Sequence, residues 1–166
     1  MPNRPPAAPL DASTLDAVDA LRHILGNHSV LALATLVMSW NAPFHRDASE
    51  GDTETTDVKA RLMAQHLDLR DGMDAIAACL AGRGALIIPE TEDEIVPAAG
   101  RRIAAAIEAG RMFDHLIAGH REMMLALDAA FDVVAAADDS DMLAILRARR
   151  TSHGRHLLEL YELAGG

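Results

Sequence analysis

Four histidines occupy comparable places in four helical patterns of this chain. Around each one, apolar residues recur every three or four positions, as on the buried face of an amphipathic helix. The four are His28, His66, His120 and His153. Each falls near the middle of its predicted helix, and the middles of antiparallel helices meet at one level. Because neutral imidazole binds zinc, iron, copper and nickel, the pattern predicts a layer of metal-binding side chains.

A hydrogen-bonded cluster without metal is the alternative for the same four residues. A histidine on an apolar face is most often a core residue bonded to a neighbour, because an unpartnered buried ring nitrogen costs free energy. The Glu-x-x-His pattern of many di-iron bundles is absent. A site poor in carboxylates favours zinc or copper over a di-iron oxidase. His156, close to His153, is expected on the surface rather than in the layer.

The composition predicts a single helical domain. The chain has 166 residues, of which half are apolar and only 3% are aromatic. Alanine and leucine dominate, which favours helix, and the length suffices for a sizeable core. A single cysteine, Cys79, excludes an intrachain disulfide and fits a reducing compartment. No apolar run reaches the roughly 18 residues of a membrane span and no signal peptide is visible, so we expect a cytoplasmic protein.

Apolar periodicity divides the chain into an arm and one bundle. Residues 1–12 carry four prolines and are expected to form a disordered arm. Residues 13–166 are expected to hold four long helices. The first ends near Trp40 and the second at Gly82 or Gly84. A long connection follows, and the third helix runs unbroken from Ile103 to Val134. The fold class predicted is all-α, an antiparallel four-helix bundle with a long connection between helices two and three.

Short motifs within the predicted helices and at their ends resemble those of the Dps family of the ferritin-like superfamily. The likeness runs from about Leu21 to Leu160, with the motifs in the family's order. They are MSWNAPF at 38–44, similar to the end of the family's first helix; MDAIA at 73–77, similar to its second helix; and LIAGHR at 116–121 with DDSDML at 138–143, similar to its third helix and the following turn. The resemblance implies a ferritin-like fold, a spherical dodecamer, and a protein that binds and oxidises iron.

The resemblance also implies where an iron-oxidising site between subunits would lie. In the family, two histidines come from one chain and an aspartate and a glutamate from its neighbour. Here the aspartate is retained as Asp74, whereas Ser39 and Ala78 replace the first histidine and the glutamate. The second histidine falls at or near Lys59, which is either an ordinary exposed lysine or a cation that pairs with Asp74 of a neighbour. One carboxylate does not make a ferroxidase site, so we expect at most weak oxidation with Asp74 as a remnant.

Three functional hypotheses follow. The first is a Dps-like iron- or metal-binding cage with a degraded ferroxidase site, in a role of iron storage and stress protection. The second is a non-catalytic ferritin-like assembly with a structural or protein-binding role. The third is a bundle with an internal histidine-bound metal, such as iron, zinc or copper. The family's DNA binding is not expected, because the net charge is −10 and Lys59 is the only lysine.

Overall fold

All regular structure in the described part of the chain is helical. The computed structural model describes residues 11–42, 52–85 and 95–165. Its elements are α1 (Ala12–Asn41), α2 (Asp52–Gly82), α3 (Ile95–Glu108), α4 (Met112–Ala136) and α5 (Ser140–Gly165). The predicted all-α class is confirmed. None of the described helices combines the length and the hydropathy needed to cross a membrane. The predicted arm lies outside the described residues up to residue 10, while Asp11 caps α1 by accepting a hydrogen bond from the backbone N–H of Thr14.

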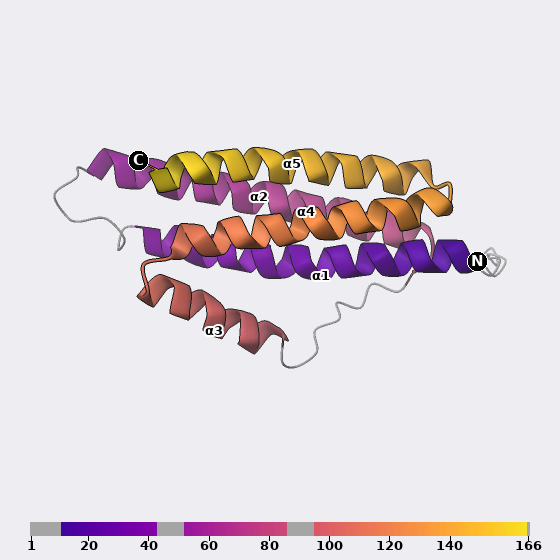
Figure 1. Ribbon diagram of the computed structural model, residues 1–166, viewed down its shortest axis with the longest axis horizontal. Helices are drawn as coiled ribbons and strands as arrows, with labels where there is room; N and C mark the ends of the chain where they lie inside the picture. Colours follow the sequence, from indigo (N-terminus) through magenta and orange to yellow (C-terminus); the bar gives the residue numbers. More distant parts are fainter. Residues whose placement is uncertain (1–10, 43–51, 86–94, 166) are drawn as a thin grey trace, which may run out of the picture.

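The four long helices lie side by side around a common core (Figure 1). Each packs against two of the others, in the ring order α1, α2, α5, α4. Helices α1 and α5 run in one direction, and α2 and α4 run in the opposite direction. The shorter α3 lies outside this group, against α1 and α4.

The predicted third helix is wrong as one unbroken element, because the chain breaks at Gly110. This glycine has a φ of 65°, in the left-handed region that favours glycine. The N–H of Gly110 donates to the carbonyl of Ile107, and the N–H of Arg111 donates to the carbonyl of Ala106. These two bonds are the Schellman motif that ends a helix. The break separates α3 from α4 and lets α3 turn back along α1.

The apolar core consists of two clusters with a gap between them. Each long helix contributes to both clusters. The gaps fall at 25–31 in α1, 69–76 in α2, 117–123 in α4 and 146–160 in α5. The gaps in α1, α4 and α5 contain His28, His120 and His153, respectively, and all three histidines are buried. A polar layer therefore divides the apolar interior into two halves.

Candidate functional site

Three buried histidines from three helices bond to one another in this layer. The Nδ1 atoms of His120 and His153 lie 2.8 Å apart, and the Nε2 atoms of His153 and His28 lie 3.1 Å apart. Each side chain is at most 1% exposed. His153 is the central member, because its two ring nitrogens face two different partners. The arrangement is a chain of imidazoles that crosses the interior from α4 through α5 to α1.

His156 continues this group toward α2. Its ring centroid lies 5.3 Å from that of His120 and 6.3 Å from that of His153. The expectation that His156 lies on the surface is wrong, since it is 2% exposed. Helix α5 packs against both α4 and α2, so its buried face is wide enough to enclose two positions three residues apart. We call His28, His120, His153 and His156 the histidine cluster.

His66 is not part of the histidine cluster. Its Nδ1 lies 3.0 Å from the carbonyl oxygen of Ala32 on α1, and its side chain is partly exposed. Ala32 is one helical turn beyond His28, and the gap in the apolar core of α2 begins only after Leu69. His66 therefore lies about one turn, or roughly 5.4 Å, from the level of the layer. The structure brings together three of the four predicted histidines, with His156 in place of His66.

Asp68 of α2 connects the histidine cluster to the surface. One carboxylate oxygen lies 3.5 Å from the Nε2 of His156 and accepts a hydrogen bond from the hydroxyl of Ser152. Arg149 and Arg155 lie 3.6 and 3.3 Å from the carboxylate. Burial raises the pKa of Asp68, but the bond from Ser152 and these cations outweigh it and hold the pKa below its usual value. Asp68 is therefore an ionised group beside His156.

Gly72 makes room for one of these contacts. Arg149 crosses α2 at this glycine and donates a hydrogen bond to the backbone carbonyl of Asp68, 3.1 Å away. A Cβ at position 72 would lie 2.9 Å from the Cδ of Arg149, closer than such atoms approach. A glycine within a helix costs about 1 kcal/mol relative to alanine. The close passage of Arg149 is a physical reason for this glycine.

Burial keeps the imidazoles of the cluster neutral. It lowers the pKa of His28 from the usual 6.5 to about 4, with a further contribution from Arg149. It lowers the pKa of His120 to about 3 and that of His153 to about 2, and the neighbouring imidazoles add to both shifts. The pKa of His156 is lowered by burial as well, although Asp68 opposes the shift. At neutral pH each ring therefore has one N–H and one lone pair available.

Some of this bonding capacity is unused within the described residues. The Nε2 of His120 and the Nδ1 of His156 are buried and have no hydrogen-bond partner. An unsatisfied buried polar atom costs about 1–3 kcal/mol. The imidazoles also do not converge on one point, because His153 faces its partners with opposite ring nitrogens. Accordingly, no group of three or more His, Cys, Asp or Glu side chains among the described residues is arranged as a ready metal site.

The positions assigned by the Dps resemblance form no common site within one chain. Asp74 and Ala78 are exposed, one turn apart on α2. Lys59 is exposed on the same helix, roughly 22 Å from Asp74 along the axis. Ser39 is fully buried, and its hydroxyl donates to the carbonyl of Leu36 at 2.7 Å. Asp74 makes no hydrogen bond or ion pair with another described residue, so it is free to face a second molecule.

Comparisons with known proteins give no relative for this chain. A scan against protein families, a search of curated proteins and a search of solved structures find no match to the chain. The Dps resemblance therefore rests on its short motifs. Function has to be inferred from the histidine cluster and its surroundings.

Proposed function

We propose that this protein is a ferritin-like four-helix bundle that binds a transition-metal ion in its interior, through His28, His120 and His153. One observation carries the proposal: three neutral imidazoles from three helices are in contact within an otherwise apolar core. Two facing neutral imidazoles hold one proton between their nitrogens. When the ring that carries this proton changes tautomer, the proton moves to its other nitrogen, and both facing nitrogens then offer lone pairs to a metal ion. His28 can make this change, because its Nδ1 is buried without a hydrogen-bond partner.

The spacing of the facing nitrogens supports this exchange. Zinc binds histidine nitrogen at 2.0–2.1 Å, so two nitrogens on a tetrahedral ion lie roughly 3.3–3.4 Å apart. The 3.1 Å between His28 and His153 has to open by only about 0.3 Å to meet this value. His120, whose Nε2 is buried without a hydrogen-bond partner, supplies the third ligand by rotation about its side-chain bonds.

The donor set favours zinc or copper over iron. Imidazole suits both metals, whereas di-iron sites in helical bundles use several carboxylates. Within the described residues no carboxylate contacts His28, His120 or His153, and Asp68 meets the cluster only through His156. Asp68 is therefore not a ligand, and it acts on the site only through His156, whose ring lies 5.3 Å from that of the ligand His120.

The test is metal analysis of protein purified without a polyhistidine tag, followed by titration of metal-free protein with zinc and with cobalt(II). We expect one ion per chain and the visible absorption of tetrahedral cobalt. His153→Ala should weaken binding at least about tenfold, a typical cost of losing support at a metal site. His23→Ala is the matched control, since His23 is exposed on α1, and should leave affinity unchanged. Failure to retain any metal, or binding indifferent to His153→Ala, contradicts the proposal.

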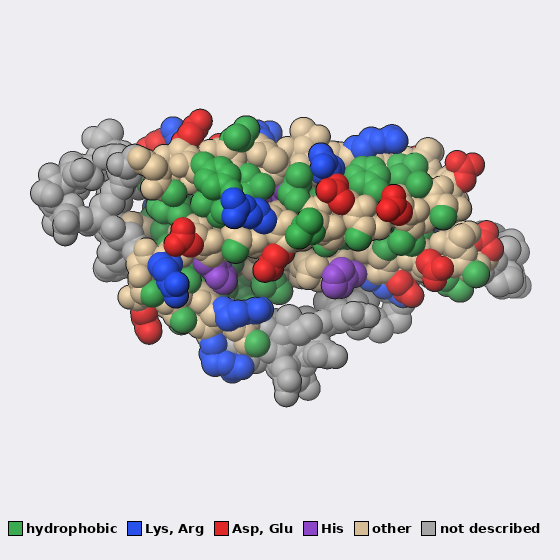
Figure 2. All heavy atoms as spheres, viewed as in Figure 1, with side chains coloured by type: hydrophobic (Ala, Val, Ile, Leu, Met, Phe, Trp, Pro, Cys, Tyr) green, Lys and Arg blue, Asp and Glu red, His purple; other side chains and the backbone are tan. Residues whose placement is uncertain are grey.

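Exposed apolar side chains favour a second, compatible proposal, that the protein assembles with copies of itself as the Dps resemblance implies. The large exposed apolar residues include Trp40, Leu125, Leu158 and Tyr161. Figure 2 shows hydrophobic side chains between charged ones over α4 and α5. The apolar surface area that is exposed to water decreases when subunits associate. Light scattering after size exclusion tests this, because a monomer has a mass of 17.7 kDa and a dodecamer twelve times that mass.

A further inference from the structure

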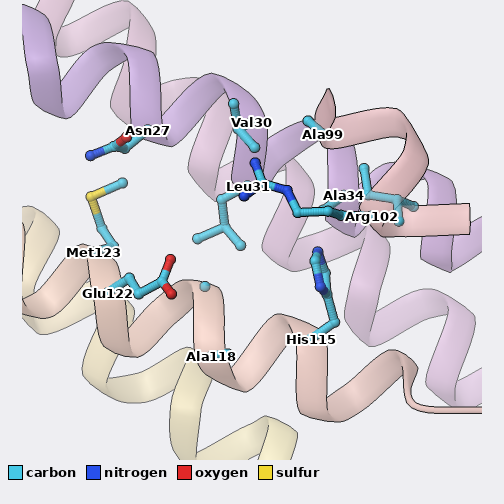
Figure 3. Close-up of a pocket in the computed structure, with 12 residues that line it drawn as sticks. Asn27, Val30, Leu31, Ala34, Ala99, Arg102, His115, Ala118, Glu122 and Met123 are labelled. Carbon is cyan, nitrogen blue, oxygen red and sulfur yellow. The ribbon is translucent and has the colours of Figure 1, made fainter. Parts of the chain in front are cut away.

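A cavity of about 410 Å³ lies between α1, α3 and α4 (Figure 3). Its inner wall includes the buried side chains of Leu31, Ala34, Ile103 and Met123. None of the four histidines of the cluster lines it. Small-molecule sites typically have volumes of about 300–1,000 Å³, apolar walls and a few polar groups. The cavity has the size and the lining of such a site.

Two oppositely charged residues, both of them exposed, face this space from its rim. Arg102 extends into the cavity from α3, and Glu122 extends into it from α4 on the opposite side (Figure 3). Within the described part of the chain, neither forms an ion pair or a hydrogen bond, with the other or with a third residue. Both charges are therefore available to a bound molecule.

His115 of α4 lies beneath Arg102 in the same cavity (Figure 3). Burial lowers the pKa of His115, the guanidinium of Arg102 lowers it further, and Glu122 opposes the shift. His115 is therefore neutral at neutral pH and serves as a hydrogen-bonding group. The cavity thus presents one cation and one anion, with no net charge.

We infer that this cavity binds a small zwitterion with an apolar side group, an α-amino acid of the leucine, methionine or phenylalanine kind. Its carboxylate pairs with Arg102 and its ammonium group with Glu122, while its side group packs on the apolar wall. A carboxylate without an amine would place an anion near Glu122, and an amine without a carboxylate would place a cation near Arg102. An uncharged apolar molecule would partly desolvate both charges without pairing either.

The experiment is calorimetric titration of the full-length protein with three probes of one shape: L-phenylalanine, 3-phenylpropionate, which lacks the amine, and phenethylamine, which lacks the carboxylate. We expect saturable binding of L-phenylalanine and at least about tenfold weaker binding of the other two, because each loses a charge-assisted pair. Arg102→Met should weaken L-phenylalanine binding to the same extent. Arg101→Met is the matched control, since Arg101 is exposed like Arg102 but does not line the cavity.

Glu122→Gln separates loss of charge from loss of structure, because it keeps the shape of the side chain. It should weaken L-phenylalanine while leaving 3-phenylpropionate equal or tighter. Circular dichroism confirms that each variant is folded. Three results overturn the inference: no saturable binding of L-phenylalanine, equal affinity for L-phenylalanine and 3-phenylpropionate, or unchanged affinity in folded Arg102→Met.

Discussion

The Nδ1 atoms of His120 and His153 lie 2.8 Å apart, and both side chains are buried. Two identical nitrogens approach this closely only when one carries a proton and the other accepts it. The pair is therefore compatible with neutral rings and is broken when both rings become protonated. A second proton would also place an unpaired charge in the apolar core. This relationship makes stability depend on pH.

Acid should destabilise the protein well above the range in which carboxylates titrate. The pKa values of His28, His120 and His153 are about 4, 3 and 2 in the folded protein, against 6.5 when unfolded. Below pH 6.5 the unfolded chain binds protons that the folded chain does not, so the free energy of unfolding falls as pH falls. Above pH 6.5 these rings are neutral in both states, so they do not make the free energy of unfolding depend on pH. We expect these three groups together to contribute at most about 4 kcal/mol per pH unit between pH 6 and pH 4.5, and the lowered pKa values of His115 and His156 add to the slope in the same direction.

Urea unfolding at pH 7, 6, 5 and 4.5 measures this slope. His120→Leu should reduce it by at most about 1.4 kcal/mol per pH unit, the contribution of one group with a lowered pKa. His23→Ala, on the exposed side of α1, should not change it. A stability that is constant from pH 7 to pH 4.5 would show that these rings are not buried as described.

Asp68→Asn should destabilise the protein by about 2 kcal/mol, the usual cost of losing hydrogen bonds to a charged group. The substitution removes the anion that faces Ser152, His156 and two arginines. It should also lower the pKa of His156 further, since Asp68 opposes the effect of burial. Urea unfolding and NMR titration of His156 provide the readouts. Asp71→Asn, exposed on the same helix, is the control and should have little effect.

Gly72→Ala should destabilise the protein by about 1 kcal/mol, although alanine is the better helix former. The new Cβ displaces Arg149 and breaks its bond to the Asp68 carbonyl. Gly26→Ala is the matched comparison, because a Cβ there meets nothing within 4 Å, and it should stabilise the protein by up to about 1 kcal/mol. Thermal unfolding of both variants decides the point, and equal stabilisation would mean that Arg149 does not need the glycine.

Fe(II) oxidation should be slow compared with that of a Dps protein whose ferroxidase residues are complete. At the positions that the Dps resemblance assigns to the site, Asp74 is the one carboxylate, Ala78 offers no donor, and Ser39 is buried with its hydroxyl bonded to the carbonyl of Leu36. Absorbance of Fe(III) after aerobic addition of Fe(II) gives the rate. Asp74→Ala should leave this rate unchanged. Rapid oxidation that depends on Asp74 would instead establish a site shared between subunits.

Local patterns in the sequence were enough to predict most of the helices. The apolar stripes predicted α1, α2 and α5, and Gly84 ends α2 with the same pair of bonds seen at Gly110. The stripe could not reveal the break at Gly110, because Ile107, Gly110 and Phe113 follow one another at three-residue intervals, so that the glycine itself fits the helical pattern. There the backbone conformation of one glycine outweighs the periodicity on both sides.

For the histidine cluster as well, the sequence predicted some members and only the tertiary structure decided the others. The sequence by itself placed His28, His120 and His153 on buried faces, since three- and four-residue spacing determines the face of a helix. Only the packing of α2 and α5 decided that His156 joins them, that His66 does not, and that Asp68 meets them from a position 88 residues earlier in the chain. The physical reason is that helical periodicity specifies the direction in which a side chain points around the helix axis. The level at which two helices meet depends instead on contacts between segments that are distant in the sequence. A shift of one helix by one turn along its axis moves a side chain by about 5.4 Å.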